Sequence, residues 1–173
     1  MYLFIFLIVL PILLFIGGLL EAPWVPTKKN DFERIAKLAT LKPGMLLYDL
    51  GSGSSEMLFY LSRTYNINCV GIEISPILYI YSKIKSLFYR KVKILFGNFY
   101  RHNVSRADVV YIFLMPKTFD KLERKLNEEL RESSKVIISC WPLKNFTPLK
   151  TSEVDNEITY YLYNKAALLS QGS

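Results

Sequence analysis

Residues 45–56 of the chain read MLLYDLGSGSSE, a short apolar run that ends in an acid and a glycine-rich turn. Short, mostly apolar runs bounded by turn signals are typical of buried strands. We therefore predict a strand at Met45–Leu50. The glycines of Gly51–Gly53 predict a sharp turn where the backbone can approach a ligand closely. The residues that follow, Glu56–Tyr65, have a helical pattern.

Strands and helices alternate along most of the chain. The apolar runs predict further strands at 68–74, 92–96, 108–115 and 135–141, and helices at 30–41, 75–88 and 117–132. After Pro142 the pattern changes to two strands, 149–154 and 157–164, joined by a turn at Asp155-Asn156. This order indicates βαβ units. We expect an α/β fold, doubly wound and Rossmann-like, with a mostly parallel seven-stranded sheet and a C-terminal antiparallel hairpin.

Two of the predicted helices carry further detail. The first opens with Asn30 and has Glu33 three residues later, which resembles a capping box. The helix that begins at Ser75, with proline at its first helical position, carries a stripe of apolar residues at helical spacing. The members of this stripe are Ile77, Ile80, Tyr81, Ile84, Leu87 and Phe88.

The N-terminal segment Tyr2–Leu20 contains no charged residue and is long enough to cross a membrane as a helix. No basic residue precedes it and no small-x-small cleavage site follows, so an uncleaved anchor is favoured over a signal peptide. Basic residues follow it closely, at Lys28, Lys29, Arg34, Lys37 and Lys42, which predicts that the rest of the chain lies on the cytoplasmic or an equivalent inner side. The predicted organisation is a transmembrane anchor at 1–20, a juxtamembrane segment at 21–29 and one domain at 30–173.

The charge of the chain is unevenly distributed. It has 22 Lys and Arg against 15 Asp and Glu, and seven of the basic residues lie between Glu73 and Asp108 with no acid among them. A solvated basic face, contact with anionic lipid and nucleic-acid binding all explain such a stretch, Lys83–Arg106. The predicted anchor favours lipid and makes nucleic acid an unlikely partner. Two cysteines and a single histidine, without a C-x-x-C pattern, predict no metal site.

The residues that indicate a ligand follow the first two strands. Ligands of an open α/β sheet bind outside the carboxyl ends of its strands. Asp49 and the glycine turn end the first strand, and Glu73 ends the second, where its carboxylate can accept the hydroxyls of a ribose. Together they predict nucleoside binding. The dinucleotide pattern G-x-G-x-x-G would need glycine at position 56, which is Glu56, so NAD is disfavoured.

The pattern D-x-G-x-G formed by Asp49, Gly51 and Gly53 resembles the first motif of class I S-adenosylmethionine-dependent methyltransferases. The resemblance implies that S-adenosyl-L-methionine is the cofactor, and that a strand end within 108–116 faces its methyl group. Ser55 stands where the family has a third glycine, and Asn98 where it has an acid beside the adenine. The implied cofactor-binding residues are Thr27, Asp49, Gly51, Ser52, Gly53, Glu73, Ile74, Asn98 and Phe99.

With its flanks included, the chain is similar to the small seven-β-strand protein-lysine methyltransferases, which include membrane-anchored mitochondrial enzymes and soluble archaeal relatives. The likeness rests on the segment Pro23–Thr27 (PWVPT) and on Leu41–Gly44 (LKPG) before the first strand. Known targets of the mitochondrial members are the ATP synthase c-subunit and the adenine nucleotide translocase. The likeness implies a protein substrate with an accessible lysine, on a membrane or membrane-proximal protein. Candidate walls of the lysine channel are Trp24, Leu114, Met115 and Pro116.

No residue of the chain is indicated as a mandatory general base for this reaction. Two other readings of the sequence remain open. The first is a methyltransferase for a lipid-soluble small molecule, and the second is a non-catalytic, anchored nucleoside-binding or scaffold protein.

Overall fold

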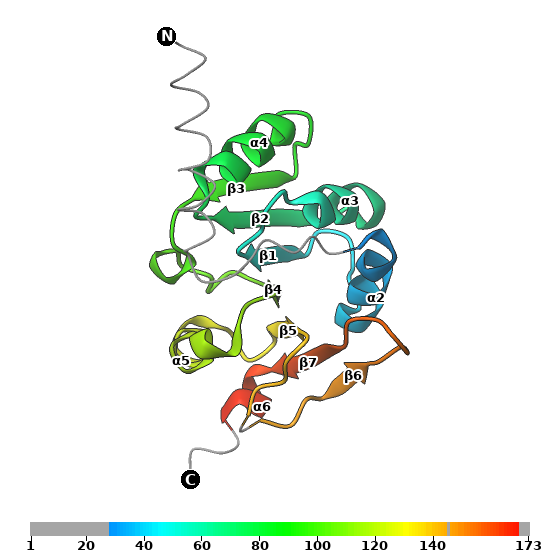
Figure 1. The fold of residues 1–173 in the computed structure, drawn as a ribbon, viewed down its shortest axis with the longest axis vertical. Coiled ribbons are helices and arrows are strands. Elements are labelled where there is room, and N and C mark those ends of the chain that lie inside the picture. Colours follow the sequence, from blue (N-terminus) through cyan, green and yellow to red (C-terminus); the bar gives the residue numbers. More distant parts are fainter. Residues whose placement is uncertain (1–27, 145, 170–173) are drawn as a thin grey trace.

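The computed structural model of the protein describes residues 28–144 and 146–169 (Figure 1). Seven strands form one sheet in the order β3-β2-β1-β4-β5-β7-β6, of which β1 to β5 are parallel and β7 is antiparallel to both β5 and β6. This confirms the predicted Rossmann-like sheet and its C-terminal hairpin. The strands are β1 Leu46–Leu50, β2 Asn68–Glu73, β3 Val92–Phe96, β4 Val109–Ile112, β5 Lys135–Ser139, β6 Lys150–Ser152 and β7 Tyr160–Asn164.

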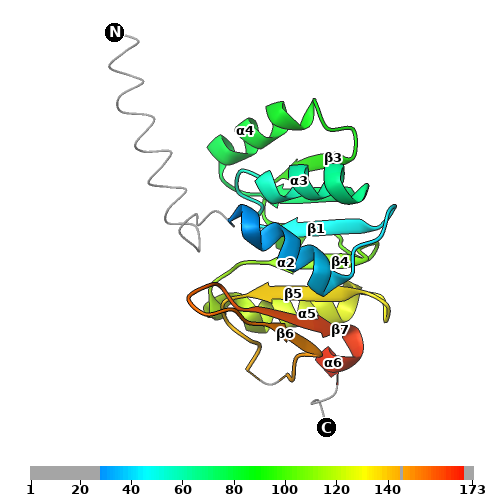
Figure 2. The ribbon, with the colours of Figure 1, turned by 90° about the vertical axis from the view of Figure 1, so that its right-hand side faces the viewer.

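Helices cover both faces of the sheet (Figure 2). One face carries α2 (Lys29–Ala39), α3 (Glu56–Tyr65) and α4 (Pro76–Ser86), and the other carries α5 (Phe119–Glu129) and α6 (Lys165–Leu169). Two apolar clusters fill the layers on either side of the sheet. The short 3-10 helices η1 (Phe99–Arg101) and η2 (Pro116–Thr118) follow β3 and β4.

The predicted anchor, Tyr2–Leu20, and the juxtamembrane residues up to Thr27 lie outside the described residues. Among the helices that the structure does describe, none combines the length and the apolar character that crossing a membrane requires.

The capping box predicted at the start of α2 is wrong. The helix begins one residue earlier, Lys28 is its N-cap residue, and no side chain caps it. Glu33 instead accepts hydrogen bonds from the hydroxyls of Tyr60 and Tyr65 in α3, each at 2.5 Å, and these bonds lower the pKa of its carboxyl. The Glu33 carboxylate therefore bonds to a neighbouring helix and not to the first turn of its own helix. A local sequence motif does not show which helices pack together.

Several predicted strands are shorter in the structure. Pairing between β4 and β1 stops at Ile112, opposite Leu50, so 113–115 leaves the sheet and leads into η2. β5 likewise stops at Ser139, since Cys140 adopts a left-handed backbone conformation with φ of 69°. Both chain segments therefore become loops at the carboxyl edge of the sheet.

The apolar stripe of α4 faces away from the sheet. A stripe of this kind normally lies against the core. Here Ser82 faces inward and is fully buried, while the stripe is largely in contact with solvent. The exposed fractions are 55% for Ile80, 50% for Tyr81, 58% for Ile84, 76% for Leu87 and 83% for Phe88.

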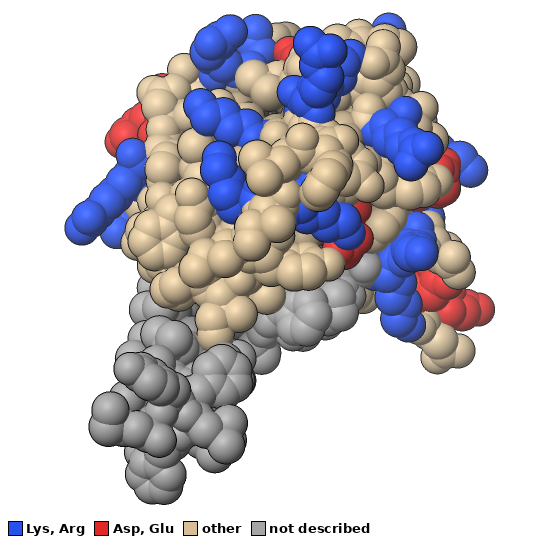
Figure 3. All heavy atoms as spheres, turned by 90° about the horizontal axis from the view of Figure 1, so that it is seen from above, with Lys and Arg blue, Asp and Glu red and all other residues tan. Residues whose placement is uncertain are grey.

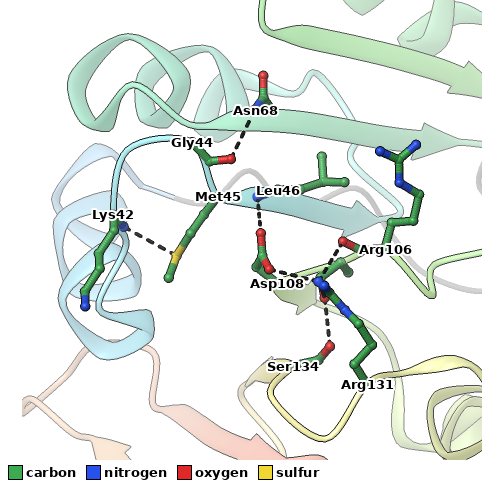
Figure 4. Close-up of polar contacts among 10 residues, drawn as sticks. Lys42, Gly44, Met45, Leu46, Asn68, Arg106, Asp108, Arg131 and Ser134 are labelled. Atoms are coloured by element: carbon green, nitrogen blue, oxygen red, sulfur yellow. Dashed lines mark hydrogen bonds and ion pairs between the residues drawn. The ribbon is translucent and has the colours of Figure 1, made fainter.

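The amino edge of the sheet is tied together around Asp108 (Figure 4). Its carboxylate accepts a hydrogen bond from the Leu46 amide at 2.7 Å and forms an ion pair with Arg131 at 2.8 Å. Arg131 also donates to the Ala107 carbonyl, as does the buried Ser134 hydroxyl. These contacts join β1, β4 and the start of β5, so this edge has a structural role and the opposite, carboxyl edge is the place to look for a site.

Candidate active site

The glycine turn after β1 is fixed to the end of β2. The amides of Gly51 and Ser52 both donate to the Ile72 carbonyl, at 2.9 and 3.0 Å. Gly51 and Gly53 have φ of 86° and 54°, in the left-handed region that glycine adopts without strain. The turn therefore holds one defined shape at the carboxyl edge.

Glu73 holds this turn from the end of β2. One carboxylate oxygen accepts from the Gly53 amide at 2.7 Å and the other from the Ser75 amide at 2.7 Å, and the residue is only 6% exposed. A carboxylate oxygen has a second lone pair, so both oxygens can still accept a hydroxyl. The predicted contact with a ribose thus stays a prediction, and the structure adds a positioning role that the sequence did not indicate.

Asp49 is a buried carboxyl group at the end of β1. Burial, and next the negative charge of Glu73, raise the pKa of Asp49 to about 8. Within the described part of the chain no lysine or arginine forms an ion pair with it. A carboxyl group held this way is suited to a ligand that brings a positive charge.

The turn has a further support from α4 that sequence reasoning missed. The buried Ser82 hydroxyl donates to the Gly53 carbonyl at 2.9 Å. The sequence gives only a weak signal, because Ser82 is one of two serines in an otherwise mostly apolar and basic helix. The inward face of α4 thus supports the turn, while its apolar stripe faces outward.

Ser52 and Ser55, two of the three serines that follow Gly51, are buried beneath the turn. A Cβ built on Gly71 in β2 would lie 2.6 Å from Ser52 Oγ, so Ser52 packs directly on that strand. Ser55 replaces the family's third glycine but keeps a left-handed backbone, with φ of 56°. Its side chain is 2% exposed and its hydroxyl donates to Ser52 Oγ at 3.0 Å. The Ser55 side chain therefore points into the protein, and Gly51 is the exposed residue of the turn.

The ends of β2 and β3 are joined at the next part of the site. The Gly97 amide donates to the Glu73 carbonyl at 2.9 Å, which places Asn98 and Phe99 beside the end of β2. Asn98 Oδ1 accepts from the Tyr100 amide at 3.0 Å and so caps η1. Phe99 is buried, and Ile74, just after β2, is partly buried.

The loops after β4 and β5 bring apolar residues to the same edge. Leu114 is 7% exposed and contacts the glycine turn, since a Cβ built on Gly51 would lie 3.5 Å from Leu114 Cδ2. Met115 is exposed, and Pro116, which is partly buried, begins η2. Trp141, 38% exposed after β5, is a further aromatic at this edge, and the sequence pattern assigned it to a strand. Trp24 and Thr27 lie outside the described residues.

Residues 49–150, more than half of the chain, match the ANTKMT methyltransferase domain. The chain belongs to this family. This chain is 28% identical over 155 residues to the protein-lysine N-methyltransferase of Saccharolobus islandicus, and the match covers 83% of this chain and 93% of that protein. It is 26% identical over 153 residues to the Rattus norvegicus lysine N-methyltransferase named for the ATP synthase c-subunit, covering 87% of this chain and 69% of that protein.

Solved structures agree with this assignment. An RNA methyltransferase from Salinibacter ruber, in complex with S-adenosyl-L-homocysteine, has 29% identity and a TM-score of 0.77, and the likeness covers 81% of this chain and 93% of that one. A methyltransferase from Geobacter sulfurreducens, also with S-adenosyl-L-homocysteine, shares the fold at 22% identity and a TM-score of 0.57, over 73% of this chain and 54% of that one. The enzyme is therefore an S-adenosylmethionine-dependent methyltransferase.

Proposed function

We propose that this enzyme methylates lysine side chains of membrane or membrane-proximal proteins. The observation that carries the proposal is the carboxyl edge itself, where a turn shaped for the cofactor lies against Leu114, beside loops that carry the exposed Met115 and Trp141. The names of the relatives from Saccharolobus islandicus and Rattus norvegicus support lysine as the acceptor.

The residues at this edge suit S-adenosylmethionine. The buried carboxyl of Asp49 would take the cofactor's ammonium group, and the outer surface of Gly51–Gly53 would receive its amino-acid end. Glu73 and Ile74 would hold the ribose, while Asn98 and Phe99 would lie beside the adenine. When bound, the cofactor supplies a methyl group on a positively charged sulfur, which an amine can attack.

The chain's own task is to present lysine as a neutral amine. Free lysine has a pKa near 10.4, so at neutral pH almost all of it is protonated. Apolar side chains around the amine disfavour its charged form, and Leu114, Met115, Pro116 and Trp141 would form such surroundings. Holding the amine in line with the methyl group lowers the activation barrier further.

We further propose that Tyr2–Leu20 anchors the enzyme in a membrane, with the catalytic domain on the cytoplasmic or an equivalent inner side. Figure 2 shows that α2 begins at the carboxyl edge of the sheet, on the side toward which the arrow of β1 points. Because α2 begins at the carboxyl edge, we propose that Trp24 reaches the lysine channel and Thr27 the cofactor.

The test is methyl transfer from labelled S-adenosylmethionine to membranes that lack this enzyme. We expect label in protein and new methyl-lysine in mass spectra of digested membranes, with much weaker transfer by Asp49→Asn at the same cofactor concentration. Membranes whose lysines have been chemically blocked should lose the signal. Label found only in small lipid-soluble molecules or only in RNA would contradict a lysine acceptor, and absence of any transfer would contradict the proposed function as a whole.

A further inference from the structure

The exposed stripe of α4 forms an apolar patch on the surface of the protein. α4 presents Ile80, Tyr81 and Ile84 outward. Leu87 and Phe88 follow directly after the helix, and Phe96 at the end of β3 is also 51% exposed. Single exposed apolar residues are ordinary on proteins, but a contiguous patch on one helix indicates a binding surface.

Basic side chains surround this patch. Lys83 in α4 and Arg90 shortly after it are exposed beside the patch, and Figure 3 shows lysines and arginines spread over this face of the protein, with acids mainly toward its margins. Glu56, an acid beside the patch, is paired with Lys85 at 2.5 Å and accepts a hydrogen bond from the Tyr81 hydroxyl. The net field of this face is therefore positive.

A hollow of about 410 Å³ adjoins the exposed end of the stripe. Phe88 is shared between the stripe and the hollow, so the two are continuous. Arg63 and Arg90 are exposed cations, and Lys91, whose amine donates to Asn66, adds a third positive charge, so the hollow suits an anion such as a phosphate group. The lining residues are Ser62, Arg63, Phe88, Tyr89, Arg90 and Lys91, with no acid among them.

We propose that this α4 surface, made of the apolar stripe and the basic hollow, docks on an anionic lipid bilayer. The stripe would enter the interface between headgroups and acyl chains, and the hollow would receive a headgroup phosphate. The inference rests on the proposed function only in that a membrane lies near the domain.

Lipid fits this surface better than other partners. An RNA footprint would use the cations and would stack bases on Tyr81 and Phe88, but it leaves the three exposed aliphatic side chains without a partner; these are Ile80, Ile84 and Leu87. A second protein or the chain's own apolar Tyr2–Leu20 would match the stripe, but neither explains three cations around a hollow without an acid. A bilayer with acidic headgroups supplies the apolar and the anionic part together.

The test uses the full chain and reads lipid contact directly. Cys69 is buried, so in a Cys140→Ser background a nitroxide label can be placed at Leu87→Cys on the stripe. Leu149→Cys is the matched control, an exposed leucine before β6 at the opposite end of the sheet. Collisions of each label with oxygen and with a polar nickel complex are measured in detergent, on phosphatidylcholine vesicles and on vesicles that also contain phosphatidylglycerol.

We expect the oxygen-to-nickel collision ratio at position 87 to rise several-fold on vesicles with phosphatidylglycerol, and the ratio at position 149 to stay unchanged. An unchanged ratio at position 87 would overturn the proposal. So would a label at position 87 shielded from both reagents in detergent, because the stripe would then be covered by protein. Shielding by added RNA but not by vesicles would replace lipid with nucleic acid.

The charge component is tested with Arg63→Gln/Arg90→Gln, two exposed residues of the hollow. Lys144→Gln/Lys150→Gln removes the same charge from exposed positions at the far end of the sheet and serves as the control. We expect only the first pair to abolish the difference between the two vesicle types at position 87. Equal behaviour of the two pairs would overturn the assignment of the hollow to a headgroup. None of these readouts requires methyl transfer, so their failure and a failure of the proposed function are distinguishable.

Discussion

The helices α3 and α4 follow consecutive strands on the same face of the sheet, yet they use their apolar residues in opposite ways. α3 buries Met57, Leu58 and Leu61 almost completely, whereas α4 exposes more than half of Ile80 and Ile84. Figure 2 shows why: α3 lies between α2 and α4, while α4 lies over the edge strand β3, and none of the helices that the structure describes lies beyond it.

The difference shows that apolar periodicity identifies a helix without identifying what covers its apolar face. In α3 the stripe stabilises the fold. In α4 the buried Ser82 faces inward and bonds to the glycine turn, while the stripe faces outward and is available for a partner. Substitutions in α3, in α4 and in the glycine turn test whether the two helices differ in this way.

Truncating the two stripes should have very different effects on stability. Leu61→Ala in α3 should lower the free energy of unfolding by about 2 to 5 kcal/mol, because it leaves a cavity in the core. Ile84→Ala in α4 should change it by less than about 0.5 kcal/mol, since the side chain is exposed. Urea unfolding of the full chain measures both, and similar losses would show that the α4 stripe is covered within the folded chain.

Replacing the Asp49 carboxyl, which can ionise beside the cofactor's ammonium group, should weaken the cofactor site. Asp49→Asn should reduce affinity for S-adenosylmethionine by about 10- to 100-fold, because a buried charge-assisted hydrogen bond contributes roughly 1.5 to 3 kcal/mol. Titration calorimetry measures the affinity. Asp155→Asn, at an exposed turn far along the chain, is the control and should bind normally; normal binding by Asp49→Asn would remove Asp49 from the site.

The same carboxyl predicts how stability without cofactor depends on pH. The pKa of Asp49 is about 8 in the folded protein against a reference value of 3.8, so between these values the folded state holds a proton that the unfolded state releases. Stability contributed by this group is therefore present at low pH and lost as pH rises toward 8. Melting temperatures from about pH 5 to about pH 9 should show a decline that Asp49→Asn reduces, and identical profiles would contradict the raised pKa.

Ser82 should matter to the site more than to the fold. Ser82→Ala removes the hydrogen bond to the Gly53 carbonyl, and we expect the KM for S-adenosylmethionine to rise about 3- to 10-fold, from roughly 1 kcal/mol, with a smaller change in kcat. Ser86→Ala provides the comparison, because that hydroxyl bonds only within α4, to the Lys83 carbonyl. Equal kinetics for the two variants would remove Ser82 from the positioning of the turn.

The smallest effect is expected at Ser55. Ser55→Gly relieves a left-handed serine, which costs about 1 kcal/mol, but also removes the hydrogen bond to Ser52. The two changes oppose each other, so melting temperature and cofactor affinity should stay close to those of the unaltered protein. A large gain in affinity would show that the serine obstructs the cofactor after all.

Much of the fold and several site positions were predictable because they depend on local patterns. The alternation of strands and helices follows from residue spacing, and the glycine turn follows from the backbone freedom of Gly51 and Gly53. Asp49 and Glu73 lie together at the carboxyl edge because parallel strands end side by side, a consequence of topology that the strand order already implied.

What only the tertiary structure decided depends on which elements are neighbours. Glu33 bonds to two tyrosines of α3 rather than to its own helix end, Ser82 reaches the Gly53 carbonyl, and the α4 stripe faces outward at the sheet edge. Hydrogen bonds and burial between residues distant in sequence have no local period. The sequence by itself therefore determined that these helices form and where the chemistry lies, while packing decided which face of each helix stabilises the fold and which remains free to bind.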